Sequence, residues 1–136
     1  MLSLNLIPHK RVCQRVSQVY PLIQKYYGKG KKSYPVIELH RDIYARLSGD
    51  PEQSGEHSSS SMAEYNEIAN EIYIYYPNIK NEEELLKSLI HEYTHYLQDL
   101  TPLKIQVHAQ NYEYDTDPHE IEAHKNERNW QMFSLK

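Results

Sequence analysis

Residues 91–95 contain two histidines and a glutamate whose types and spacing suit metal-assisted hydrolysis. The order is His91-Glu92-Tyr93-Thr94-His95. Two histidines four residues apart lie on one face of a helix, about one turn from each other, so both imidazoles can reach the same ion. A glutamate next to the first histidine can accept a proton from a water molecule that the ion activates. The pattern therefore predicts Zn²⁺ as a cofactor, His91 and His95 as its ligands, and Glu92 as the general base.

The sequence on both sides of these residues predicts the helix that they require. Asn81 can cap a helix, and the three glutamates that follow it, at 82–84, suit the positive end of the helix dipole. Apolar residues then recur at steps of three and four, at Leu86, Leu89, Ile90, Tyr93, Leu97 and Leu100. His91 and His95 fall opposite the centre of this apolar stripe. The alternative to a metal site is therefore a solvated helix face.

A hydrolytic zinc site usually has three protein ligands and one position for water, so a third ligand is needed. The candidates lie in residues 117–124, where Asp117 and Pro118 have the order of a helix N-cap followed by a proline at the first helical position. Glu120 and Glu122 would point about 200° apart on such a helix, so at most one of them faces the metal. Without a metal, Glu120 could form a capping box with Asp117, and Glu122 could be a solvated carboxylate.

These motifs together resemble the gluzincin type of zincin metallopeptidase. The HExxH motif at 91–95 is followed, after a short insertion, by Glu120-x-x-Ala123 on a second expected helix. The resemblance is closest to the small, minimal zincins of bacteria and phages, including the ImmA/IrrE-type peptidases. It implies that Glu120 is the third ligand, that Ala123 lets the two helices approach, and that His124 supports the ligands from outside the metal's coordination sphere. Asparagine or aspartate is usual at this last position, so His124 could also be a ligand or an outer proton carrier.

The resemblance also implies an α+β, zincin-like fold. In that fold a small mixed or antiparallel sheet packs on the HExxH helix, with an N-terminal helix and a C-terminal helix that carries the third ligand. The residue patterns predict a helix over 10–27 with a kink or break at Pro21, and strands over 34–40, 62–66 and 71–76. In zincins the strand before the metal-binding helix lies at the sheet edge and binds the substrate backbone. An edge strand has the backbone groups for this. The sequence does not indicate which of the expected strands lies at the edge.

Length and composition are typical of one small domain. The chain has 136 residues, which predicts a single domain over 1–136. Within it, we expect a basic helical segment over 1–33, and the sheet and metal-binding helices over 34–136. Thirteen tyrosines against one phenylalanine and one tryptophan suit a half-exposed sheet, a substrate groove or an interface.

Charge is distributed unevenly along the chain. Residues 1–48 contain nine lysines and arginines against two acidic residues, whereas residues 49–136 contain six against seventeen. A basic N-terminal segment can bind nucleic acid. Its positive residues are dispersed and no recognition motif accompanies them, which favours a solvated helix face that packs on an acidic body.

The cysteine content and the absence of targeting signals limit the protein class. Cys13 is the only cysteine, which excludes an intrachain disulfide and a cysteine-based zinc site. No signal peptide and no apolar stretch of membrane length is recognisable, so we expect a cytoplasmic protein without a membrane partner. No feature of the sequence predicts an oligomeric state.

Two further segments bear on the site. Residues 48–61 are polar and rich in serine, and we expect a mobile loop or a lid over the site. Residues 101–116 link the two expected metal-binding helices. A tyrosine or histidine near a zincin metal often stabilises the transition state. The sequence leaves four candidates without a preference: His108, Tyr112, Tyr114 and His119.

The sequence thus predicts a zinc-dependent metallopeptidase. Zinc would polarise the scissile carbonyl, and Glu92 would accept the proton of water and pass it to the leaving amine. The substrate class, peptide or protein, follows from the resemblance alone. Two alternatives stay open. One is an inactive zinc-binding regulatory or interaction protein on a zincin scaffold, against which the intact Glu92 argues. The other is a nucleic-acid-associated protein that uses the basic N-terminal segment.

Overall fold

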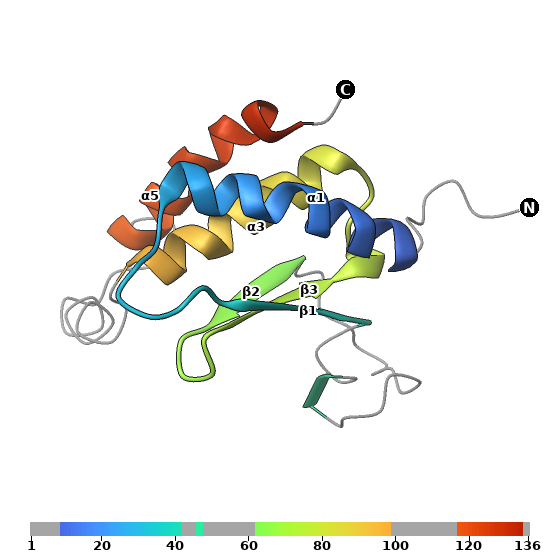
Figure 1. Cartoon of the computed structure of the whole chain (residues 1–136), viewed down its shortest axis with the longest axis horizontal. Helices are drawn as coiled ribbons and strands as arrows, with labels where there is room; N and C mark the ends of the chain where they lie inside the picture. The colour runs from blue at the N-terminus through green and yellow to red at the C-terminus, as the bar shows by residue number, and fades with distance from the viewer. Residues whose placement is uncertain (1–8, 42–45, 48–61, 99–116, 135–136) are drawn as a thin grey trace, which may run out of the picture.

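The computed structural model describes residues 9–41, 46–47, 62–98 and 117–134, in which helices pack on one face of a small sheet (Figure 1). The helices are α1 (His9–Tyr27), α3 (Glu82–Leu97) and α5 (Pro118–Glu127), and the strands are β1 (Val36–His40), β2 (Ala63–Asn66) and β3 (Glu71–Tyr75). Two 3₁₀ helices, η1 (Tyr76–Asn78) and η3 (Arg128–Phe133), follow β3 and α5. The predicted α+β class is confirmed, with the sheet packed on the helix that carries residues 91–95.

Several sequence predictions fall on other parts of the chain. The expected loop at 48–61 and the linker at 101–116, including His108, Tyr112 and Tyr114, lie outside the described residues. The division into domains also stays a prediction. None of the described helices combines the length and the apolar character that crossing a membrane requires.

The sheet is mixed, as predicted, and β3 occupies its centre. β1 pairs with β3 in parallel, and β2 pairs with β3 in the antiparallel direction. The strand before the metal-binding helix is β3, so among the described strands it does not have the edge position that this strand has in zincins. The side chains of β3 are buried on both faces of the sheet. Ile72 and Ile74 belong to the hydrophobic core, and Tyr73 and Tyr75 on the opposite face are 5% and 1% exposed. Such burial is typical of a strand with neighbours on both sides.

One hydrophobic cluster joins α1, β3, α3 and η3. Its members on α1 are spaced by three and four residues and form one face of that helix: Val12, Val16, Val19 and Ile23. The larger contribution comes from α3, with Leu85, Leu86, Leu89, Ile90, Tyr93 and Tyr96, and η3 adds Phe133. α3 is thus fixed between the sheet and α1. It provides a rigid base for the side chains on its remaining face.

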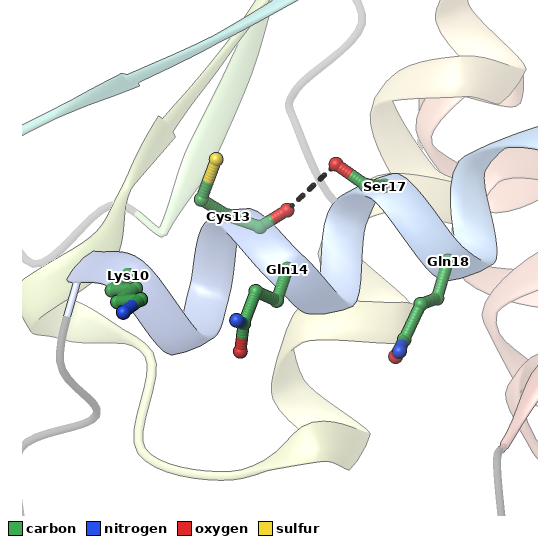
Figure 2. A pocket seen from close by; sticks show the side chains of 5 residues that line it. All are labelled: Lys10, Cys13, Gln14, Ser17 and Gln18. Carbon is green, nitrogen blue, oxygen red and sulfur yellow. Dashed lines mark hydrogen bonds between the residues drawn. The ribbon is translucent and has the colours of Figure 1, made fainter.

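The sequence predicts a kink or a break at Pro21. α1 continues through Pro21, so the helix is not broken there. Proline lacks the N–H group that would bond to the carbonyl four residues earlier, which here belongs to Ser17. The Ser17 hydroxyl in turn donates to the Cys13 carbonyl at 3.0 Å (Figure 2). Pro21 and Ser17 are both exposed, on the side away from the core. A helix tolerates the loss of a bond on its solvent side, where its carbonyls can bond to water instead.

Tyrosine hydroxyls fix the segment that returns the chain from α1 to β1. Tyr96 of α3 donates to the Lys32 carbonyl at 2.6 Å and accepts from the Gly30 N–H at 2.9 Å. Tyr93 donates to the carbonyl of Gly28, and Tyr20 of α1 donates to the Pro35 carbonyl at 2.6 Å. These tyrosines therefore supply both apolar volume and a polar end to the core, a use that composition did not indicate.

Basic residues of the N-terminal segment contact acidic or polar groups of the rest of the chain. Arg15 pairs with Glu82 of α3 at 2.9 Å, and the Lys32 ammonium donates to the Glu67 carbonyl at 2.5 Å. These contacts agree with a helix that packs on an acidic body. Binding of nucleic acid stays the less favoured alternative from the sequence.

Candidate metal centre

α3 places His91 and His95 side by side, as the four-residue spacing predicts. The helix begins after Asn81, whose side chain accepts from the Glu84 N–H at 2.9 Å, so the predicted cap is confirmed. The two imidazole rings lie 4.9 Å apart between centroids. Each histidine is only 8% exposed. The alternative of a solvated helix face is therefore wrong, because α5 packs over this face of α3.

α5 brings Glu120 to both histidines. Asp117 caps this helix by accepting from the His119 N–H at 2.8 Å, and Pro118 follows at the first position. Glu120 Oε1 lies 2.9 Å from His91 Nε2 and 3.2 Å from His95 Nε2. The carboxylate faces the imidazoles and does not form the capping box that the sequence offered as an alternative. Together the three side chains could hold a metal ion, since one ligand atom of each lies within 4.8 Å of the others.

A small residue, Ala123, is fully buried on α5, the helix that packs against α3. This burial agrees with the role in helix approach that the resemblance implied. One turn further along, the Asn126 amide donates to the Thr94 hydroxyl at 3.1 Å. The Thr94 hydroxyl donates to the Ile90 carbonyl at 2.8 Å. These contacts set the position of α5 along α3 and hence the reach of Glu120.

The other candidates for the third ligand lie elsewhere. Glu122 is exposed and accepts from the Gln98 amide at 2.7 Å, so only one of the two glutamates faces the histidines, as predicted. His119, which the sequence offered as a candidate for stabilising the transition state and not as a ligand, is held by Asp117, with 2.9 Å between Nδ1 and Oδ1. His124 is exposed, and its ring lies beside that of His91, with 4.8 Å between centroids.

Each histidine of the pair has a partner on its second ring nitrogen. His91 Nδ1 lies 2.7 Å from Glu127 Oε2, and His95 Nδ1 lies 2.9 Å from Gln98 Oε1. A carboxylate only accepts, and the Gln98 amide nitrogen already donates to Glu122 and to the His119 carbonyl. Both Nδ1 atoms must therefore carry the proton, and in the neutral rings the Nε2 lone pairs point at the Glu120 carboxylate. Two lone pairs and a carboxylate repel one another unless a proton or a cation lies between them.

The pKa values of the two histidines and of Glu120 are shifted in the directions that this need for positive charge predicts. Burial alone would lower the pKa of His91, but its hydrogen bonds with Glu120 and Glu127 outweigh burial and raise it above its ordinary value. His95 shifts in the same direction, through Glu120 and Gln98. Burial would raise the pKa of Glu120, yet its bonds to the two histidines hold it well below its usual range. A metal ion would replace these protons and satisfy the same charges.

Glu92 lies next to this cluster and is almost fully buried. It is 9% exposed, and the backbone N–H of Tyr65 in β2 donates to its carboxylate. Burial, with a smaller contribution from the charge of Glu120, raises the pKa of Glu92 to about 7, although His91 and His95 oppose the shift. A carboxyl group that titrates near neutral pH can both accept and release a proton under ordinary conditions.

Sequence reasoning missed two residues of this site, Glu127 and Gln98. The spacing of each residue from an expected ligand could have indicated it. Glu127 follows Glu120 by seven residues, two turns along the same face of α5, and Gln98 follows His95 by three. Polar residues at such steps from expected ligands are the natural candidates for partners of the ligands.

Comparisons with protein-family models, with curated proteins and with solved structures found no match to this chain. The likeness to zincins therefore rests on the residues of α3 and α5 and on the way the fold brings them together.

Proposed function

We propose that His91, His95 and Glu120 bind one Zn²⁺ ion and that the chain is a zinc-dependent peptidase with Glu92 as its general base. The convergence of two imidazole Nε2 atoms and a carboxylate carries this proposal. The outward hydrogen bonds of both Nδ1 atoms support it, because metal-binding histidines characteristically donate their other ring N–H to an acceptor.

The donor set fits zinc. Two neutral histidines and one carboxylate are a known ligand combination of hydrolytic zinc sites, which leave a position for water or substrate. When bound there, the ion would supply Lewis acidity, which polarises a carbonyl group and makes water more acidic. The choice of zinc over another divalent ion follows from ligand type.

The role of Glu92 follows from its place between α3 and β2. Its carboxylate is held by the Tyr65 N–H and lies beside the histidine pair, so it can take a proton from water and give it to a leaving amine. A site that only bound metal for stability would not need a buried carboxylate with a pKa near 7. Glu92 therefore supports a hydrolase over the inactive zinc-binding alternative.

A peptide substrate is the part of the proposal that depends on the zincin resemblance. The structure supports it through β2, an edge strand among the described strands, whose residue Tyr65 contacts Glu92 directly. An edge strand can pair with an extended peptide and hold its backbone next to the catalytic groups.

The test compares matched variants of the full chain. We expect about one zinc per chain in the wild type and in Glu122→Ala, and little zinc in Glu120→Ala, measured by elemental analysis after purification without added metal. Hydrolysis of a mixed peptide library, followed by mass spectrometry, should occur with the wild type and not with Glu92→Gln, although this variant keeps its zinc.

Two outcomes would contradict the proposal. Absence of zinc in the wild type, even after zinc is supplied, would remove the metal centre. Full zinc occupancy with no difference between wild type and Glu92→Gln towards the peptide library would favour the regulatory alternative.

A further inference from the structure

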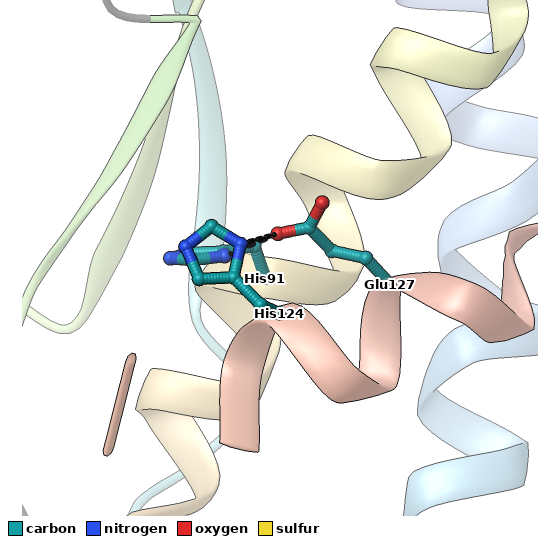
Figure 3. Close-up of side chains that lie close together, drawn as sticks. All are labelled: His91, His124 and Glu127. Carbon is teal, nitrogen blue, oxygen red and sulfur yellow. Dashed lines mark hydrogen bonds and ion pairs between the residues drawn. The ribbon is translucent and has the colours of Figure 1, made fainter. Parts of the chain in front are cut away.

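We propose that His124, Glu127 and the Nδ1 atom of His91 form a second, weaker site for a divalent cation. Figure 3 shows these three side chains close together. Glu127 lies at Nδ1 of the His91 ring, whereas Glu120 lies at its Nε2. This second site shares His91 with the centre proposed above but does not depend on peptidase activity.

The geometry supplies three donors of the kinds that zinc and cobalt accept. Glu127 Oε2 lies 2.7 Å from His91 Nδ1 and 2.9 Å from His124 Nδ1, and one ligand atom of each residue lies within 4.8 Å of the others. His124 and Glu127 are three residues apart on α5, so they share one face of that helix. At present two N–H groups converge on one carboxylate oxygen. A cation in this position would replace those two protons.

The second site is the more open of the two. The side chain of His124 is 55% exposed, whereas those of His95 and Glu120 are 10% and 18% exposed. An ion can therefore reach His124 and Glu127 from solution without passing the buried pair, and water can complete its coordination.

The two sites share the imidazole of His91, and this makes the metal affinity of the second site the lower of the two. The first ion takes Nε2 of His91, so an ion at Nδ1 must displace the last ring proton and accept a second cation across the same ring. We therefore expect the second ion to bind at least about tenfold more weakly than the first. It would also take Glu127 from His91, so an excess of metal should lower any activity that depends on the first site.

The competing explanation is that Glu127 and His124 only orient His91. Equilibrium dialysis of the metal-free full chain against Co²⁺ and Zn²⁺ distinguishes the two. We expect two equivalents in the wild type, one tight and one weak, and a single tight equivalent in His124→Ala. His119→Ala is the matched control, because this histidine is on the same helix and belongs to neither group, and it should keep both equivalents. His95→Ala should lose the tight equivalent and keep the weak one.

His124→Phe provides a second variant that keeps an aromatic ring beside His91 but has no donor nitrogen. It should behave like His124→Ala. One equivalent in the wild type up to millimolar metal would overturn the second site alone. A weak equivalent that survives in both His124 variants would overturn it as well. Absence of any metal binding would overturn this site and the proposed function together.

Discussion

At the scale of single residues, Glu127 is the side chain that fixes the orientation of His91. Its carboxylate accepts from Nδ1 at 2.7 Å and so directs Nε2 towards Glu120. We predict that Glu127→Ala weakens zinc binding by about 10–100-fold, since partners of metal ligands typically contribute that much. Competition with a chromophoric chelator measures the effect. Glu83→Ala, which removes an exposed carboxylate of α3 that pairs with Lys87 outside the site, is the control. Equal zinc affinity in the two variants would show that His91 needs no acceptor.

Glu92 should make the stability of the metal-free protein depend on pH. Burial raises its pKa from 4.5 to about 7 in the folded state, so between these values the unfolded chain has released a proton that the folded chain still holds. The contribution of this group to the free energy of unfolding therefore falls as the pH rises from 4.5 to 7. Glutamine has no proton to release, so Glu92→Gln should be the more stable form above pH 7, by up to about 3 kcal/mol, and no more stable at pH 4.

Urea unfolding of chelator-treated protein across this pH range measures that difference. Contributions from titrating groups that do not interact with Glu92 cancel when the two proteins are compared at each pH. His91 and His95 do contribute to the difference, because the charge of Glu92 raises their pKa values. A difference between wild type and Glu92→Gln that does not vary with pH would mean that the folded protein does not resist ionisation of Glu92.

At the scale of elements, the site depends on the distance between α3 and α5. Ala123 is fully buried on α5, the helix that packs against α3. We predict that Ala123→Leu separates the helices, lowers the free energy of unfolding by about 1–3 kcal/mol and weakens zinc binding, because Glu120 moves away from the histidines. Thermal unfolding and chelator competition test both effects. Ala69→Leu, at an exposed position in the turn between β2 and β3, should change neither. Normal zinc affinity in a destabilised Ala123→Leu protein would contradict the dependence on helix spacing.

The elements also show which features can be predicted from the sequence. Asn81 and Asp117 gave correct helix starts, because capping is decided by neighbouring residues. The central place of β3 could not be derived, since strand order depends on pairing between distant segments. The burial of His91 and His95 could not be derived from the pattern of α3 either, and the approach of a second helix was expected from the resemblance alone. The apolar stripe of α3 predicts the face that meets the sheet, but α5 covers the opposite face with a weakly amphipathic surface on which Ile121 is 53% exposed.

At the scale of the whole molecule, a bound metal would add a link between two helices that are far apart in the sequence. His95 and Glu120 lie 25 positions apart in the chain, on different helices. An ion held by both binds the folded state and not the unfolded one, so it raises the free energy of unfolding by an amount that depends on its free concentration. We predict a gain of about 2.7 kcal/mol when zinc is present at 100 times its dissociation constant.

Thermal unfolding with zinc, and again after removal of zinc with a chelator, measures this gain. His95→Ala should unfold at the same temperature with and without zinc, up to concentrations that fill weaker sites, because one of its three tight ligands is missing. Stabilisation of the wild type but not of His95→Ala would mean that the metal acts through α3 and α5 together. Equal stabilisation of both proteins would place the effective ion elsewhere on the chain and would contradict the assignment of His91, His95 and Glu120.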